Sequence, residues 1–251
     1  MPLFETESMV LKTYNLGDAD KIVVLLTHDH GIIRGVAKGA KRLKSRFGSG
    51  LEPFSVVTAS YFQKDSQELV SIQKIDIVRS NFTAASAPDF LQKFSYLSDI
   101  LIMFLPPHDP NPTMYRMVRA CIETAAVRPD AIQALGLYFE IWLLRLSGYL
   151  PDWGSCDECA RAFEEGEGAG VRSNFHLICL NCHRSSRGML DGASRRLAAS
   201  AMSLSPGDFA EAAEAATESV PALSRILRQL ISHSAGREVA GETSLAVGTG
   251  N

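Results

Sequence analysis

Residues 21–38, with the sequence KIVVLLTHDHGIIRGVAK, decide how the first part of the chain folds. Two runs rich in β-branched residues, 21–28 and 32–38, flank the short polar segment DHG. β-Branched residues favour strands, whereas Asp and Gly between apolar runs favour a turn. The pattern therefore predicts two neighbouring strands joined by a tight turn.

Three more strands are predicted around this pair, at 7–15, 54–63 and 68–78. In the last of them the alternation of apolar residues slips between Ile72 and Ile75, which indicates a bulge or a change of face. No helix long enough for a crossover separates the five strands, which argues against a parallel sheet. A small antiparallel barrel or sandwich remains. Five strands with a long connection between the third and the fourth fit an OB-type β-barrel, which is the fold expected over residues 1–80.

Beyond residue 82 apolar residues recur at the three- and four-residue spacing of helices, which predicts an α-helical domain over residues 81–251. Helices are expected at about 90–104, 112–126, 130–148, 206–215 and 219–235. Gly148 and Gly236 are expected to end helices, and Ser205 to cap one. The small polar tail, about 238–251, is expected to be disordered. The fold class is therefore α+β and multidomain.

Four of the five cysteines form two Cys-x-x-Cys pairs, which are Cys156 with Cys159 and Cys179 with Cys182. This spacing is typical of a zinc ribbon, in which each pair grips the ion from one side. Four thiolate ligands leave no position for a reactive water, so one structural Zn²⁺ per chain is expected, in an insertion at about 151–188. The rival interpretations are a redox dithiol at the first pair and His183 as a competing ligand.

The segment 31–48 is basic and holds no acidic residue; its cations are Arg34, Lys38, Lys41, Arg42, Lys44 and Arg46. A lone basic run is more often a solvated loop than a binding site. Here, flanking glycines let the backbone bend around a phosphodiester chain, and the run lies where an OB-type barrel often receives single strands. Candidates for stacking on bases are Phe47, Phe54, Tyr14 and Tyr61, although strand aromatics more often belong to a core.

The chain has 251 residues, 46% of them hydrophobic, and a formal net charge of −3. These values indicate a globular protein without an overall attraction to nucleic acid. The sequence shows neither a bilayer-length apolar stretch nor the pattern of a signal peptide, so a cytoplasmic protein without a membrane partner is expected. Because the motifs of nucleotide hydrolases, serine hydrolases and zinc proteases are absent, the protein is expected not to be an enzyme.

The chain resembles the RecO family of bacterial recombination mediators over roughly residues 1–235. The resemblance lies in ESMVLKTYNLGDADKIVVLLTHDHG (7–31), GVAKGAKRLKSRFGSGLEPFSVVTASYF (35–62) and YFEIWLLRLSGYLPDWGSCDECA (138–160). CLNCH and LSRILRQLISHSAGRE then follow in the order typical of the family. The resemblance implies an N-terminal OB-fold, and a helical domain that carries a zinc-binding insertion.

The resemblance also implies a function in recombinational DNA repair. Such proteins bind single- and double-stranded DNA and anneal complementary strands without consuming ATP. With RecR, and sometimes RecF, they help load RecA onto strands coated by single-stranded-DNA-binding protein. The positions that match the family's basic loop and its cysteines are Lys38, Lys41, Arg42, Lys44, Arg46, Cys156, Cys159, Cys179 and Cys182.

Two departures from the family pattern stand out. Ala160 replaces the glycine that commonly follows the first cysteine pair, which is expected to matter little, and the tail after Arg237 lacks Lys and Arg, which puts a DNA contact there in doubt. Two rival functions stay open, a zinc-ribbon adaptor that binds proteins without annealing DNA, and a zinc hydrolase. The hydrolase would need the open coordination position that four cysteines do not leave.

Overall fold

The computed structural model describes residues 2–63, 68–182 and 188–236. The chain forms two compact units, one extending to Pro129 and the other beginning at Asp130. The expected disorder of the tail, and the suggestion of His183 as a ligand, concern positions outside the described residues. The predicted division of the chain at residue 80 stays a prediction.

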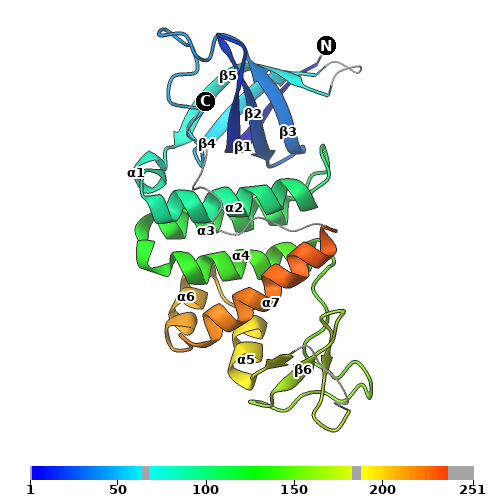
Figure 1. Ribbon diagram of the computed structural model, residues 1–251. Coiled ribbons are helices and arrows are strands. Elements are labelled where there is room, and N and C mark those ends of the chain that lie inside the picture. The colour runs from blue at the N-terminus through cyan, green and yellow to red at the C-terminus, as the bar shows by residue number, and fades with distance from the viewer. Residues whose placement is uncertain (1, 64–67, 183–187, 237–251) are drawn as a thin grey trace, which may run out of the picture. The chain divides into compact units, whose positions relative to one another are not determined.

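Five strands open the first unit and form a closed barrel in the order β1-β2-β3-β5-β4 (Figure 1). Their bounds are β1 Leu3–Leu16, β2 Asp20–Thr27, β3 Gly31–Ala37, β4 Val56–Phe62 and β5 Val70–Arg79. Neighbouring strands pair antiparallel, except that β3 and β5 pair in parallel through Gly35 with Val70 and Val36 with Ser71. The structure thus confirms the predicted five-stranded barrel.

The bulge predicted in the fifth strand is also confirmed. Ser60 of β4 pairs with Lys74 of β5, and the next residue, Tyr61, pairs with Ile72, so one residue of β5 is extra. A bulge shifts the alternation of side chains by one position. Ile72 and Ile75, three residues apart, can therefore both belong to the buried core of the barrel.

Three helices complete the first unit, namely α1 Phe82–Ala85, α2 Pro88–Phe104 and α3 Pro112–Val127. Phe54, which precedes β4, packs against Phe90 and Phe94 of α2, with ring centroids 5.7 and 5.9 Å apart. On the barrel, Glu7 accepts hydrogen bonds from Tyr115 and Arg119 of α3, at 2.9 and 2.5 Å. Apolar and charged contacts together therefore hold α2 and α3 against the barrel.

The turn between β2 and β3 requires a glycine. Gly31 has a φ of +65°, and a Cβ atom there would lie 2.2 Å from the carbonyl oxygen of Asp109, in the loop between α2 and α3. Glycine alone tolerates both conditions. The same loop is tied to the barrel by a hydrogen bond of 3.1 Å from the backbone N–H of His108 to the carbonyl of Ile32.

The second unit is built around a buried helix. After a short 3₁₀ turn (Pro129–Ala131), its helices are α4 Ile132–Leu146, α5 Gly192–Ser200, α6 Pro206–Glu214 and α7 Ser219–Ser234. On α4 the Tyr138 hydroxyl donates to the carbonyl of Leu204 (3.1 Å) and the Trp142 indole to that of Ala201 (2.8 Å). Tyr138 is thus buried and Trp142 partly buried, each with its polar atom hydrogen-bonded.

Helix ends in this unit follow the sequence signals. Gly148 and Gly236 adopt left-handed φ values of +77° and +64° directly after α4 and α7. The Ser205 side chain accepts a hydrogen bond from the backbone N–H of Asp208 at the start of α6. All five predicted helices are confirmed, whereas the sequence did not predict α1 or α5.

Between α4 and α5 the chain forms a small three-stranded sheet in the order β7-β6-β8. Its strands are β6 Ala169–Val171, β7 Leu177–Ile178 and β8 Gly188–Leu190. This ribbon carries the four paired cysteines, as predicted. Among the helices that the structure describes, none is long and apolar enough to cross a membrane.

Candidate metal centre and basic loop

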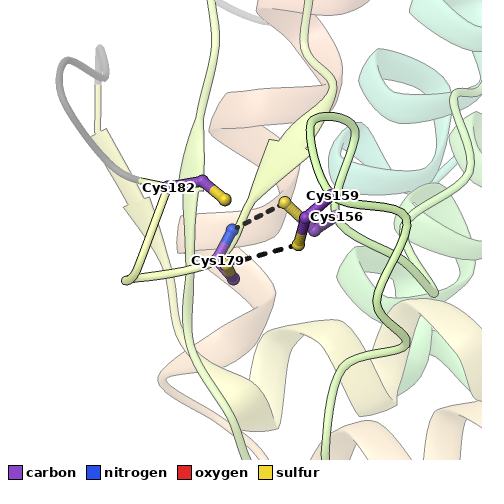
Figure 2. Close-up of side chains that lie close together, drawn as sticks. All are labelled: Cys156, Cys159, Cys179 and Cys182. Carbon is purple, nitrogen blue, oxygen red and sulfur yellow. Dashed lines mark hydrogen bonds between the residues drawn. The ribbon is translucent and has the colours of Figure 1, made fainter.

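Four cysteine side chains meet in the ribbon. Figure 2 shows Cys156 and Cys159 on one loop, facing Cys179 and Cys182 on another. Their four Sγ atoms all lie within 4.8 Å of one another, and those of Cys159 and Cys179 are 4.0 Å apart. The predicted set of cysteines is therefore gathered at a single point.

Each cysteine pair sits on a tight turn closed by a backbone hydrogen bond. The N–H of Ala160 donates to the carbonyl of Cys156 (2.9 Å), and the N–H of Cys182 donates to that of Cys179 (3.1 Å). The two turns also touch, because the N–H of Cys179 donates to the Cys156 sulfur at 3.3 Å. In the first turn Ala160 has a φ of +59°, in the left-handed region. The replacement of glycine at this position therefore has a structural consequence.

The thiol pKa values show how the turns prepare the centre for a cation. Burial alone would raise the pKa of Cys156, but hydrogen bonds from the backbone N–H groups of Cys159, Cys179 and Glu158 outweigh it and lower the pKa to about 6. Hydrogen bonds with the sulfurs of Cys179 and Cys159 raise the pKa of Cys182 to about 12. Without a metal, the close approach of the sulfurs thus disfavours deprotonation of all four thiols. A divalent cation at the centre would stabilise the four thiolates together.

The donor set and its spacing fit a tetrahedral thiolate metal. Four sulfurs at bonds of about 2.3 Å around Zn²⁺ would lie about 3.8 Å from one another, which is close to the spacing found here. Thiolates select soft or borderline metals over Mg²⁺ and Ca²⁺. The four cysteines are therefore positioned to hold a metal ion, and they leave no open ligand position.

Ion pairs stabilise the turn that carries Cys156 and Cys159. The Arg172 guanidinium contacts the carboxylates of both Asp157 and Glu158, the two residues between the paired cysteines. The Nδ1 atom of His176 lies 2.9 Å from Oδ1 of Asp157, whereas Arg172 contacts the Oδ2 atom of the same carboxylate. Arg161 makes a two-point ion pair with Glu167, at 3.0 and 2.6 Å, which lowers the pKa of that carboxyl to about 2. The acidic residues of the ribbon are thus partly neutralised within it.

Sequence reasoning missed Arg195 of α5. Its guanidinium donates to three backbone carbonyls of the loop before the ribbon sheet: Glu164 at 2.7 Å, Glu167 at 2.9 Å and Trp153 at 3.4 Å. It also lies 4.6 Å from the ring centroid of Phe163. A single cation therefore organises the loop that contains the first cysteine pair. No local motif marks such a residue, because its partners are backbone atoms distant in sequence.

The basic loop, defined as residues 38–55, joins β3 to β4. Phe47 and Leu51 of this loop are buried in the core of the barrel. The start of the loop is tied to the turn between β1 and β2, since the N–H of Lys41 donates to Ala19 (2.9 Å) and the N–H of Gly39 donates to the Asp20 carboxylate (2.7 Å). The loop is therefore fixed to the barrel by its backbone and by its apolar side chains.

The predicted DNA-binding cations are all at least partly exposed. Arg34 lies on β3, and the basic loop carries the others, Lys38, Lys41, Arg42, Lys44 and Arg46. Within the described residues, none of the six forms an ion pair with a carboxylate; Lys41 donates to the carbonyl of Gly17, and Arg46 to that of Ile72. The loop thus presents uncompensated positive charge to solvent.

Three of the four aromatic candidates for base stacking were wrong. Phe47, Phe54 and Tyr61 are buried, because the barrel core and α2 enclose them. Tyr14 is half exposed on β1, where it pairs with Ile22 of β2. It lies just before the β1–β2 turn to which the basic loop is tied. Tyr14 is thus the one of the four whose ring is available to a base.

Comparison with known proteins assigns both regions to one family. A family model described as "Recombination protein O N terminal" matches residues 1–81, and one described as "Recombination protein O C terminal" matches residues 94–241. The chain belongs to the RecO family. The N-terminal RecO match contains the barrel and the basic loop, and the C-terminal RecO match contains the four cysteines.

Similar proteins bear the same name. The DNA repair protein RecO of Koribacter versatilis is 32% identical over 201 residues, which cover 78% of this chain and 79% of that protein. The DNA repair protein RecO of Streptomyces coelicolor is 31% identical over 194 residues, covering 72% and 75%. That of Bifidobacterium longum is 34% identical over 162 residues, covering 64% and 68%. The likeness to RecO proteins thus extends over most of the chain.

Proposed function

We propose that this RecO protein is a non-enzymatic factor of recombinational DNA repair that binds DNA and anneals complementary strands. It acts in the cytoplasm on single- and double-stranded DNA and, with RecR and in some cases RecF, helps load RecA onto strands coated by single-stranded-DNA-binding protein. Membership of the RecO family, whose relatives are named DNA repair proteins, supports the assignment to repair. The annealing activity and the protein partners rest on the resemblance to RecO proteins.

The observation that carries the proposal is the exposed charge of the basic loop. Two DNA strands repel each other, so a protein that brings them together must supply cations on a surface that both can reach. Residues 41–44 are all exposed, and three of them, Lys41, Arg42 and Lys44, are cations. The turns that carry these cations are fixed to the barrel. Phosphates bound there would displace counterions, which makes the affinity depend on salt.

The four cysteines serve this function indirectly in the proposal. They hold one Zn²⁺ whose ligand set is closed, so it stabilises the ribbon and does not activate a water molecule. The ribbon carries exposed acidic side chains such as Glu164 and Glu165, which disfavour contact with phosphates. In this proposal DNA therefore binds to the barrel. The ribbon is a structural element whose surface is suited to protein contacts.

The test is a binding and annealing assay on a variant of the basic loop. Replacing Lys41, Arg42, Lys44 and Arg46 with Ala should slow annealing of complementary oligonucleotides. The slope of log affinity against log salt should become shallower by about 0.7 for each phosphate of a single strand that the variant no longer neutralises. A matched control removes four cations elsewhere, Lys74, Arg116, Arg196 and Arg225, and should leave the slope close to that of the unmodified protein.

The same assay distinguishes the proposed annealing factor from a zinc-ribbon adaptor. A zinc-ribbon adaptor would bind single strands weakly, would not anneal them, and would behave alike in both quadruple variants. Equal affinities and equal slopes for the basic-loop variant and the unmodified protein would contradict the assignment of DNA to this loop.

A further inference from the structure

The tip of the basic loop exposes an apolar side chain. Leu43 has a relative exposure of 102%, the highest of any large apolar side chain in the described part of the chain. Its neighbours Lys41, Arg42 and Lys44 are all exposed cations. A leucine at this place buries no surface in the free protein, so packing does not account for it.

Leu43 is presented by ordered backbone. The N–H of Ser45 donates to the carbonyl of Arg42 (3.0 Å), which places Leu43 and Lys44 at the two central positions of a turn. The preceding turn is closed by a bond from the N–H of Arg42 to the carbonyl of Gly39 (3.1 Å). A few residues further on, Phe47 is buried in the barrel core. The leucine therefore projects from a fixed point.

The order of side chains on this turn limits what it can bind. A partner must offer negative charge to Lys41, Arg42 and Lys44, and apolar surface to Leu43 between them. Single-stranded DNA offers both, because its phosphates alternate with bases whose faces are free. A DNA duplex hides those faces in its stack unless an apolar side chain enters between base pairs. The arrangement therefore fits an unpaired strand best.

We propose that Leu43 packs against the face of an unstacked base of single-stranded DNA while the flanking cations hold its phosphates. This inference rests on the proposed DNA-binding function of the basic loop and deepens it. Every base has an apolar face, so the contact does not select a sequence. Its consequence is that a bound strand is held with its bases spread apart, as pairing with a second strand requires.

The experiment compares two ligands that differ only in their bases. One is a fluorescein-labelled oligothymidine of fifteen nucleotides, and the other is an oligomer of equal length in which abasic sites replace the thymidines. Phosphate contacts are common to both, and a base contact is possible only with the first. Leu43→Ala should weaken binding of the oligothymidine about five- to tenfold, as expected when part of the apolar surface of a leucine is no longer buried against a base. Binding of the abasic oligomer should change less than about twofold.

Two further variants sharpen the result. Lys44→Ala should weaken both ligands alike, because it removes a cation that holds a phosphate. Leu43→Phe, whose ring can stack on a base, should keep or increase the preference for oligothymidine. Leu91→Ala, at an exposed leucine on α2, is the matched control and should alter neither affinity. Because Leu43 is fully exposed, its replacement should leave the fold intact.

The possible outcomes separate this inference from the function on which it rests. If Leu43→Ala leaves both affinities unchanged, or weakens both ligands equally, the base contact is refuted while DNA binding by the loop stands. If the unmodified protein binds neither ligand in a salt-dependent way, the proposed function fails, and the base contact fails with it. Selective weakening of oligothymidine binding supports the contact.

Discussion

Ala160 places a conformational strain on the candidate metal centre. Its φ of +59° lies in the left-handed region, which costs a residue with a Cβ atom about 1 to 2 kcal/mol and costs glycine almost nothing. The turn that carries Cys156 and Cys159 forms nevertheless, because the bond from the N–H of Ala160 to the carbonyl of Cys156 closes it. The first cysteine turn is therefore less stable than its hydrogen bonding alone would make it.

Ala160→Gly should tighten metal binding. Glycine relieves the strain but adds entropy to the unfolded chain, so the net gain should be about 0.5 to 1 kcal/mol, or about two- to fivefold in Zn²⁺ affinity. Competition with a chromogenic chelator measures that affinity. Ala162→Gly is the matched control, since Ala162 lacks the left-handed φ and glycine there should weaken binding slightly. Equal effects of the two substitutions would show that the conformation of Ala160 is not under strain.

Some single residues could be interpreted from sequence alone, and others could not. Ser205, Gly148 and the paired cysteines act through neighbours in the chain, so spacing was enough to predict them. The roles of Phe47 and Tyr61 depend on which way each side chain faces after the barrel closes. For Tyr61 on β4, a period of two does not distinguish the core face of the strand from a binding face, and for Phe47 in the basic loop no such period applies.

At the scale of elements, α5 determines how the ribbon is held. Its Asp191 cap accepts a hydrogen bond from the N–H of Ser194 (2.7 Å), which starts the helix directly after β8 and aims Arg195 at the loop before the ribbon sheet. The sequence did not predict this helix because it is short and carries a single large buried residue, Leu197. A hydrophobic repeat needs several turns to be visible, and α5 is too short to show one.

Arg195→Ala should loosen the ribbon. The change removes donors from three carbonyl groups and the contact with Phe163, which should cost about 2 to 3 kcal/mol of local stability. Faster amide exchange and faster proteolysis within residues 160–168 would report this loosening. Arg195→Lys keeps the charge but lacks the planar fork that reaches several acceptors, so it should restore the stability in part.

An exposed cation on another helix gives the control. Arg225→Ala removes the same charge from an exposed position on α7 and should leave exchange in the loop unchanged. If both alanine variants behave alike, net charge and not the hydrogen bonds to the loop would explain the effect.

For the whole molecule, the candidate metal centre and the proposed DNA-binding loop lie in different compact units. The basic loop belongs to the first unit and the four cysteines to the second. Both tryptophans of the chain, Trp142 and Trp153, also belong to the second unit. Tryptophan fluorescence therefore reports on the unit that carries the candidate metal centre, while a labelled oligonucleotide tests the proposed DNA site in the other unit.

Removing the metal should affect the two signals differently. A chelator should lower the midpoint of thermal unfolding followed by tryptophan fluorescence, because binding energy at a structural metal site contributes directly to folding. Oligonucleotide affinity at a temperature well below that midpoint should change less than about twofold. Adding Zn²⁺ back should restore the midpoint. A loss of DNA binding with unaltered tryptophan fluorescence would instead place the metal centre in the DNA site.

The strands of the barrel could be predicted well from the sequence, whereas the pairing of β3 with β5, which closes the barrel, could not. The runs 21–28 and 32–38 fix a hairpin, and the slip at Ile72 and Ile75 marks a bulge, because each signal is local. The pairing of β3 with β5 joins residues far apart in the chain and involves few of them. No periodicity in the sequence records such a contact.

The short pairing between β3 and β5 is also the place where the barrel is expected to open first. Among the described residues, β3 meets β5 at two positions, Gly35 with Val70 and Val36 with Ser71, whereas β1 and β2 pair along most of their length. Fluctuations that part strands begin where the fewest bonds must break. The basic loop leaves β3 just beyond this junction, and Arg46 also holds the carbonyl of Ile72 on β5. Parting there would break the bond from Arg46 to β5, whereas Phe47 and Leu51 would stay in the core and the β1–β2 hairpin would stay paired. The barrel would therefore open first at its β3–β5 edge, beside the basic loop.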